Sequence, residues 1–301
     1  MNLLSETFII LENEIDYPDD QNFAVIIGEK PSKGARSPKL WNAAFSSLSI
    51  KSKMIAMDVA NTNFSQLLSL LSTNPYFLGG SIAVPYKVNA ASWFQDDLSP
   101  EAFVIGSVNS MFRSKAGKLI GTNTDGEAAV DSLVHYVGDI EGKSILVLGG
   151  GGTGKAVIAY LKNKIGNTGR ILLACRKNFP NIQMINRLKI DELIEWVDID
   201  KVLKNVDVVI NCTSIGTNET SDISPLSSDQ LSILPTKAIV FDINYNPNPT
   251  KLLKLSKDRG LITIDGLLMN KQQAVLSFAY ANNIASNSEK FEIINKSMTL
   301  M

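Results

Sequence analysis

The stretch "ILVLGGGGTGKAV", residues 145–157, decides the fold, because an apolar run ends in consecutive glycines and is followed by a helical pattern. The phosphate loop G-x-x-x-x-G-K fits from Gly149 to Lys155, and the dinucleotide turn G-x-G-x-x-G fits from Gly149 to Gly154. A phosphate loop needs Ser or Thr after its lysine to bind Mg²⁺, and this chain has Ala156 there. The dinucleotide turn needs a strand before it and a helix after it, and both patterns are present. The stretch therefore predicts a dinucleotide-binding unit, with an ATPase as the minor alternative.

The glycines of this turn are expected to let the backbone approach a pyrophosphate at the helix N-terminus, and they are Gly149, Gly151, Gly152 and Gly154. The next strand-like run, residues 169–175, is followed by Arg176 and Lys177. A carboxylate at that point would select NAD through the ribose 2′-hydroxyl, whereas cations favour the 2′-phosphate of NADP. NADP is therefore the expected cofactor, and NAD is the less favoured alternative.

Strand and helix patterns alternate on both sides of the glycine turn. Short apolar runs that read as strands lie at 23–28, 53–59, 79–84, 143–149, 169–175, 206–213, 238–245 and 261–266. Such runs, separated by helices, indicate parallel sheets covered on both faces. We expect an α/β fold of two domains: an N-terminal α/β substrate domain of residues 1–124 plus 269–301, and a Rossmann-type dinucleotide-binding domain of residues 125–268.

Composition excludes several classes of protein. The formal net charge is −1 and the pI is about 6.0, which gives no reason to expect a nucleic acid or membrane partner. No apolar run approaches the ~18–20 residues that span a bilayer. The first 29 residues contain no Lys or Arg, so we expect no signal or transit peptide and a cytoplasmic protein.

Few residues are available for metal or disulfide chemistry. The chain has one histidine and two cysteines, so we expect neither a metal site nor a disulfide framework. Residues 1–22 precede the first predicted strand and include "DYPDDQN". We interpret them as a peripheral segment, with an arm that binds a partner as the alternative.

Seven short motifs follow one another along the chain. They are "GARSPKLWNAAF" (34–45), "GGSIAVPYK" (79–87), "GSVNS" (106–110), "GTNTDG" (121–126), "INCTSIGT" (210–217), "DINYNPNPT" (242–250) and "DGLLMNKQQA" (265–274). With the glycine turn, they make the chain from about residue 23 to 285 resemble the shikimate dehydrogenase family. The resemblance implies an NADP-dependent oxidoreductase of aromatic amino-acid and chorismate biosynthesis. Such an enzyme exchanges a hydride reversibly between NADPH and a cyclic keto acid such as 3-dehydroshikimate.

The resemblance also implies roles for individual residues. Lys87 and Asp125 match the family's catalytic pair, in which the lysine handles the proton of the reacting hydroxyl and the aspartate aligns it. The implied substrate contacts are Ser37, Asn109, Tyr245 and Gln273. Thr213, in "INCTSIGT", is placed with the cofactor. The expected partner is a small-molecule substrate, and the expected assembly is a monomer or a homodimer.

The chain departs from the family at the end of the pocket that holds the substrate carboxylate. The family reads S-x-S-P-x-x-H-N and N-V-T-x-P-x-K, where this chain has Ala35, Trp41 and Ala83 in place of Ser, His and Thr. Two hydroxyls are thus replaced by methyl groups. Each hydrogen bond to a charged group contributes ~1.5–3 kcal/mol, so their loss is expected to weaken binding of the substrate carboxylate. Arg36 or Lys33 could take over the carboxylate, and Trp41 either packs beneath the loop or narrows the pocket. A divergent paralogue, with another cyclic alcohol as substrate or with no turnover, therefore remains the alternative.

Overall fold

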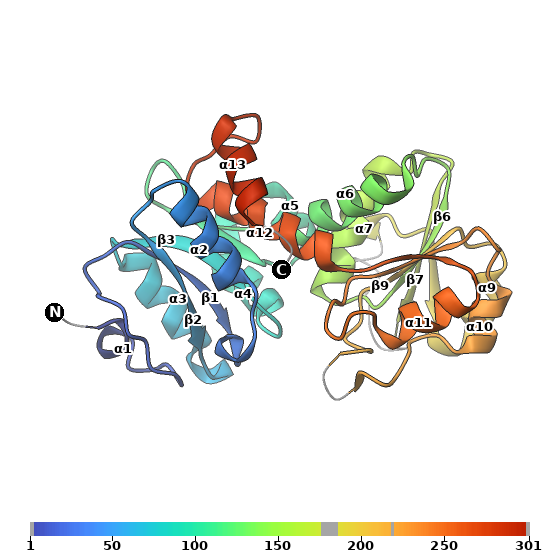
Figure 1. Ribbon diagram of the computed structural model, residues 1–301, viewed down its shortest axis with the longest axis horizontal. Coiled ribbons are helices and arrows are strands. Elements are labelled where there is room, and N and C mark those ends of the chain that lie inside the picture. Colours follow the sequence, from blue (N-terminus) through green and yellow to red (C-terminus); the bar gives the residue numbers. More distant parts are fainter. Residues whose placement is uncertain (1–2, 176–185, 218–219, 299–301) are drawn as a thin grey trace. The chain divides into compact units, whose positions relative to one another are not determined.

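The computed structural model describes residues 3–175, 186–217 and 220–298. The chain divides into two compact units, which are described separately below (Figure 1). Unit 1 consists of Met1–Thr124 and Lys271–Met301, and unit 2 consists of Asp125–Asn270. The second boundary lies inside a helix and two residues later than the sequence analysis expected.

Unit 1 is built on a mixed sheet with the strand order β2-β1-β3-β4-β5. Its strands are β1 (Phe23–Gly28), β2 (Lys53–Asp58), β3 (Phe77–Ile82), β4 (Ser110–Arg113) and β5 (Leu119–Thr122). β1 pairs in parallel with β2 and β3, whereas β4 and β5 form an antiparallel hairpin at the far edge. The predicted parallel runs are confirmed for the first three strands, and the hairpin was not anticipated.

Helices cover both faces of this sheet, since the side chains of β1 alternate between the faces. Phe23, Val25 and Ile27 face one apolar cluster, while Ala24 and Ile26 face the other. The helices and helical turns that belong to unit 1 are α1 (Leu4–Thr7), η1 (Pro31–Lys33), α2 (Ser37–Ser47), η2 (Asn61–Asn63), α3 (Phe64–Thr73), α4 (Lys87–Phe94), η3 (Gln95–Asp97), α5 (Pro100–Ile105) and α13 (Glu289–Ser297). Helix α12 (Leu267–Ala281) begins in unit 2 and continues in unit 1.

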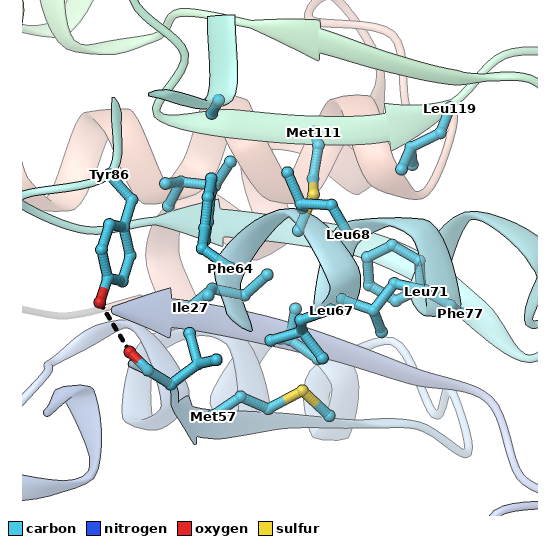
Figure 2. Packing of buried hydrophobic residues seen from close by; sticks show 14 of the residues in the cluster. Ile27, Met57, Phe64, Leu67, Leu68, Leu71, Phe77, Tyr86, Met111 and Leu119 are labelled. Atoms are coloured by element: carbon cyan, nitrogen blue, oxygen red, sulfur yellow. Dashed lines mark hydrogen bonds between the residues drawn. The ribbon is translucent and has the colours of Figure 1, made fainter. Parts of the chain in front are cut away.

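The cluster on the α3 side of the sheet is packed from several elements, as Figure 2 shows. Leu67, Leu68 and Leu71 of α3 are fully buried against the strands. Tyr86 is also buried there, and its hydroxyl donates a 2.7 Å hydrogen bond to the Val59 carbonyl (Figure 2). This bond fixes the start of α4, which carries Lys87, against the carboxyl end of β2.

The segment before β1 belongs to the same core. Leu4, Phe8 and Ile15 are buried in the cluster on the α3 side. The Asn13 side chain donates to the Ala56 carbonyl at 3.0 Å and accepts from the Asp58 amide at 2.7 Å. The interpretation of residues 1–22 as peripheral is therefore wrong for the part of the segment that the structure describes.

Unit 2 is built on a parallel sheet with the strand order β11-β10-β9-β6-β7-β8. Its strands are β6 (Ser144–Leu148), β7 (Arg170–Cys175), β8 (Glu192–Glu195), β9 (Val208–Asn211), β10 (Ile239–Asp242) and β11 (Ile262–Ile264). Its helices and helical turn are α6 (Asp125–Val137), α7 (Gly152–Lys164), η4 (Trp196–Asp198), α9 (Asp200–Leu203), α10 (Ser228–Ile233) and α11 (Lys251–Asp258). This arrangement confirms the predicted α/β fold class with a Rossmann-type unit.

The side chains of β6 point alternately to the two faces of the sheet, and both faces are covered by helices. Ile145 and Val147 belong to the cluster formed with α6 and α7, and Leu146 and Leu148 belong to the cluster formed with α9, α10 and α11. Because every strand runs in the same direction, their carboxyl ends form one edge. Ligands of such sheets bind outside that edge.

Candidate functional site

The carboxyl ends of β1, β2 and β3 lie at one edge of the unit 1 sheet. Asp58, the last residue of β2, accepts hydrogen bonds from the backbone amide of Ser32, at 2.9 Å, and from its hydroxyl. These bonds tie the loop after β1 to the end of β2. They fix the path by which the chain reaches Ser37, the buried first residue of α2.

The backbone of Val108 holds Lys87 at the same edge of the unit 1 sheet. Lys87 is the first residue of α4, its side chain is half-buried, and its carbonyl accepts from the Val108 amide at 2.8 Å. The Ile82 amide donates to the Asn109 carbonyl, also at 2.8 Å. Unit 1 thus brings the carboxyl end of β3 and the start of α4 next to the backbone of Val108 and Asn109.

The buried side chain of Asn109 binds the last residue of unit 1. Its Oδ1 accepts from the Thr124 amide at 2.8 Å, and its Nδ2 donates to Thr124 Oγ1 at 3.0 Å. The Thr124 hydroxyl in turn donates to the Gln273 carbonyl at 3.2 Å. Asn109 and Gln273, both expected as substrate contacts, are therefore joined through a threonine that the sequence analysis did not single out.

The residues that depart from the family pattern share one apolar cluster. Ala35 and Ala83 pack against a cluster that contains Trp41 and Phe278, with the rings of the last two 5.1 Å apart. Trp41 is fully buried, and its Nε1 has no hydrogen-bond partner among the described residues. Trp41 is therefore a core residue beneath the loop, as the first of the two interpretations expected.

In unit 2 the glycine turn has the geometry that its sequence predicts. Gly149 follows β6 with φ of +95°, in the region that favours glycine, and Gly151 is the N-cap of α7. A Cβ on Gly154 would lie 2.0 Å from the Gly149 carbonyl oxygen, so no other residue fits without a backbone shift. Gly151 is exposed, and a Cβ there would meet no atom within 4 Å, so the N-terminus of α7 has room for a pyrophosphate.

Replacing Gly154 by alanine is expected to lower the free energy of unfolding by about 1–3 kcal/mol, because the new methyl group overlaps backbone. Urea unfolding measures the change. Gly151→Ala is the matched control, since Gly151 has φ of −66° and a Cβ there would meet no atom within 4 Å. The control is expected to stay within about 0.5 kcal/mol of the parent. Equal losses in both variants would contradict the described turn.

Asp125 is buried at the start of α6, next to the glycine turn within unit 2. The Thr153 hydroxyl donates to Asp125 Oδ2 at 3.5 Å, at the long limit of a hydrogen bond. A Cβ on Gly126 would lie 2.3 Å from the Ala156 carbonyl oxygen, so the backbones of α6 and α7 are in direct contact. The first turn of α6 is thereby fixed against the glycine turn.

A polar network lies at the carboxyl ends of β9 and β10, where Asn211 and Asp242 are partners in register. Asp242 is fully buried, and its Oδ1 accepts from Asn211 Nδ2 at 3.0 Å and from the Asn244 amide at 3.1 Å. Its Oδ2 accepts from the Thr250 hydroxyl at 2.7 Å. Asn211 Oδ1 accepts from both the amide and the hydroxyl of Thr213, at 3.0 and 2.7 Å. The network thus determines the conformation around Thr213.

Burial raises the pKa of the Asp242 carboxyl from its ordinary value of 3.8 to about 6, although the hydrogen bonds it accepts act in the opposite direction. Between these two pH values the folded protein keeps a proton that the unfolded chain has lost. The free energy of unfolding therefore falls, through this group, as the pH rises from 3.8 through about 6.

The Asp242→Asn variant lacks this dependence, because an amide does not titrate. Relative to the variant, the parent is expected to lose about 2 kcal/mol of unfolding free energy between about pH 4.5 and about pH 7.5. Urea unfolding at both pH values measures the difference. Parallel pH dependences in the two proteins would contradict a raised pKa at Asp242.

The remaining predicted residues are placed as follows. Thr213 and Tyr245 lie in the loops after β9 and β10 of unit 2. Arg176 and Lys177, on which the choice of NADP rested, lie outside the described residues. The sequence analysis missed Thr124, Asn211, Asn244 and Asp242. A usable signal was present for two of them, since Asn211 and Asp242 end otherwise apolar strands at the edge where ligands bind.

The described part of the chain has neither a cluster of metal-ligating side chains nor a helix that could span a membrane. Among residues 3–175, 186–217 and 220–298, no three His, Cys, Asp or Glu side chains are grouped so that they could hold a metal ion. No helix within these ranges has the length and apolar character needed to cross a bilayer.

Comparisons with known proteins agree over both units. Residues 26–111 match the model of the shikimate dehydrogenase substrate binding domain. The chain is 30% identical over 279 residues to a shikimate dehydrogenase (NADP(+)) of Alkaliphilus oremlandii, covering 89% of this chain and 93% of the relative. It is 34% identical over 259 residues to the enzyme of that name from Lactococcus lactis subsp. cremoris, covering 82% and 87%. The crystal structure of shikimate dehydrogenase from Aquifex aeolicus has a TM-score of 0.79 at 26% identity, covering 94% and 99%.

Proposed function

This chain belongs to the shikimate dehydrogenase family, and we propose that it catalyses the reversible, NADP-dependent interconversion of shikimate and 3-dehydroshikimate. It is an oxidoreductase that acts on a CH–OH group, as its relatives are. The observation that carries the proposal is the extent of the match to enzymes named shikimate dehydrogenase (NADP(+)), over 89% of the chain. Cytoplasmic location and a monomeric or homodimeric state are part of the proposal.

The proposal gives Lys87 the proton transfer. When bound, NADPH would supply a hydride to the carbonyl carbon, and NADP+ would accept one from the carbon that bears the hydroxyl in the reverse direction. The ammonium of Lys87, at the start of α4, releases a proton to the forming alkoxide in one direction and receives it in the other. Its half-buried position and the bond from Val108 to its carbonyl support this role, because they fix the backbone from which the Lys87 side chain extends at the edge of the unit 1 sheet.

Asp125 is proposed to align the reacting hydroxyl. It is fixed at the start of α6, where Gly126 brings the helix against the cofactor turn. A carboxylate in this place accepts a hydrogen bond from the substrate hydroxyl and orients it for transfer. Ser37, Asn109, Gln273 and Tyr245 are proposed to bind the remaining polar groups of the substrate.

The cofactor is proposed to bind at the carboxyl edge of the unit 2 sheet. Gly149, Gly151, Gly152 and Gly154 would hold the pyrophosphate at the N-terminus of α7. The absence of room for a Cβ at Gly154 supports this fit, because the dinucleotide turn needs a glycine where the helix approaches the preceding backbone closely. Thr213 would line the same edge, and Arg176 with Lys177 would bind the 2′-phosphate.

A second candidate follows from Ala35 and Ala83, whose methyl groups belong to an apolar cluster in unit 1. A pocket with these residues holds a carboxylate less strongly than one with hydroxyls there. The chain could accordingly act on a different cyclic alcohol, or bind the nucleotide without turnover.

The test is the change in absorbance at 340 nm with shikimate, quinate and aminoshikimate, each with NADP and with NAD. The expected result is turnover of shikimate that is faster with NADP than with NAD. Turnover of another cyclic alcohol alone would favour the second candidate. Absence of turnover with every compound and both nucleotides would overturn the proposed reaction.

A further inference from the structure

We propose that Asp242 is a positioning residue for the cofactor: its carboxylate holds the loops after β9 and β10 in the shape that binds the nicotinamide nucleotide. The proposal rests on the proposed function, because it concerns the same cofactor. It assigns a role to a residue that does not itself touch the substrate or the reacting atoms.

The first step is the joining of two loops through one buried group. Asp242 Oδ1 accepts from the Asn211 side chain, which ends β9, and from the Asn244 amide, which follows β10. Both bonds are close to 3 Å, and the carboxylate is fully buried. Because a buried donor without an acceptor is destabilising, the two loops keep the same position relative to each other as long as the carboxylate is present.

The second step leads from these asparagines to Thr213. Asn211 Oδ1 accepts from the amide and hydroxyl of Thr213, and Asn244 Nδ2 donates to the Thr213 carbonyl at 3.0 Å. Asn211 and Asn244 also donate to the Ile215 carbonyl, each at 3.2 Å. The backbone of Thr213–Ile215 is therefore held by the side chains of Asn211 and Asn244, and Asp242 binds the side chain of the first and the backbone amide of the second.

The third step reaches the glycine turn. A Cβ on Gly149 would lie 2.8 Å from the Thr213 methyl group and 3.2 Å from the Thr213 amide nitrogen. The loop that Asp242 shapes is therefore in contact with the first residue of the turn proposed to hold the pyrophosphate. A shift of Thr213 would alter the shape of that turn's surface.

The second oxygen of the carboxylate, Oδ2, accepts a hydrogen bond from the N-cap residue of α11. Thr250, the N-cap of this helix, donates to Asp242 Oδ2 at 2.7 Å while its hydroxyl accepts from the Leu253 amide. Asparagine at position 242 keeps the bonds from Asn211 and Asn244, since its Oδ1 accepts both, and its Nδ2 donates to the Thr250 oxygen. Only the Thr250 O–H loses its acceptor in this variant. Alanine keeps none of these bonds.

The experiment measures the dissociation constant of NADPH by its fluorescence in the full-length protein. Asp242→Ala is expected to raise this constant about 10- to 100-fold. Its kcat at saturating NADP and shikimate is expected to fall no more than about threefold, and its KM for NADP to rise with the dissociation constant. Asp242→Asn is expected to restore the dissociation constant to within about threefold of the parent.

Asp207→Ala is the matched control in the same sheet. Asp207 Oδ2 accepts from the Ser144 amide at 2.8 Å, at the opposite, amino-terminal edge of β6 and β9. This variant is expected to lose stability without a change in NADPH affinity. An effect of Asp242→Ala no larger than that of the control, or an Asp242→Asn variant as impaired as Asp242→Ala, would overturn the proposal.

Should Asp242→Ala fail to fold, Asn244→Ala provides the same test, because it removes the donors to Thr213 and Ile215. An unchanged NADPH dissociation constant in that variant would overturn the proposal. Fluorescence titration requires no turnover. Parent protein that binds NADPH without oxidising shikimate would therefore refute the proposed function and leave this inference testable.

Discussion

Replacing Lys87 by alanine is expected to lower kcat for shikimate oxidation by about 10²–10⁴, the usual contribution of proton transfer by a positioned side chain. The ammonium sits on the first residue of α4, and its helix is fixed by the buried hydroxyl of Tyr86. Removal of the amine leaves these contacts in place, so the loss is expected in kcat rather than in folding. Initial rates at 340 nm and the melting temperature measure the two separately.

Lys115→Ala is the matched control for this prediction, because Lys115 is an exposed cation in the turn between β4 and β5. It is expected to keep the parent's rate. Added ethylamine is expected to restore part of the rate of Lys87→Ala, since a small amine can occupy the space of the lost one and carry the proton. A Lys87→Ala enzyme with the parent's kcat would exclude Lys87 as the proton donor.

Restoring the hydroxyls at positions 35 and 83 is expected to lower the KM for shikimate. Each hydrogen bond to the carboxylate contributes ~1.5–3 kcal/mol. The double variant Ala35→Ser/Ala83→Thr is therefore expected to bind shikimate about 10²–10⁴-fold more tightly than the parent. The parent has only methyl groups there, packed against a cluster that includes Trp41. Steady-state kinetics of the single and double variants measure the change in KM.

Ala43→Ser, in the middle of α2, introduces a hydroxyl that is not part of the family's carboxylate motif. It is expected to leave the KM for shikimate unchanged. A second readout separates the carboxylate from the ring: an uncharged ester of shikimate is expected to gain nothing from the double substitution. Unchanged KM for shikimate in the double variant would show that another group, such as Arg36 or Lys33, already holds the acid.

The parallel strands that are buried on both faces, such as β1 and β6, could be predicted because such burial demands unbroken apolar runs. β8 could not, because only Ile194 of its four residues is buried. The β4–β5 hairpin could not, since "SMFR" and "LIGT" are short and their place depends on distant contacts. One such contact joins the hydroxyls of Ser110 and Ser277, 167 residues apart, at 2.6 Å. Local patterns contain no information about a pair of this kind.

The same limit applies to the site. The glycine turn was predictable because its spacing is local and each glycine has a steric reason. The Asp242 network was not, because its bonds join residues from three separate segments, such as Asn211 and Thr250. The burial of Leu4 and Phe8 was missed for a related reason, since a single helical turn has too few residues to show a period.

The way in which Asn13 contacts β2 has a consequence for self-association. β2 is an outermost strand, and such strands offer unpaired amides and carbonyls as templates for another chain. The amide side chain of Asn13 imitates a neighbouring strand, because it pairs with one donor and one acceptor of β2 while the Glu12 amide occupies the Asp58 carbonyl. The exposed edge of β2 is thereby partly occupied by the chain's own residues, and a second copy that docked at β2 would have to use side chains rather than extend the sheet.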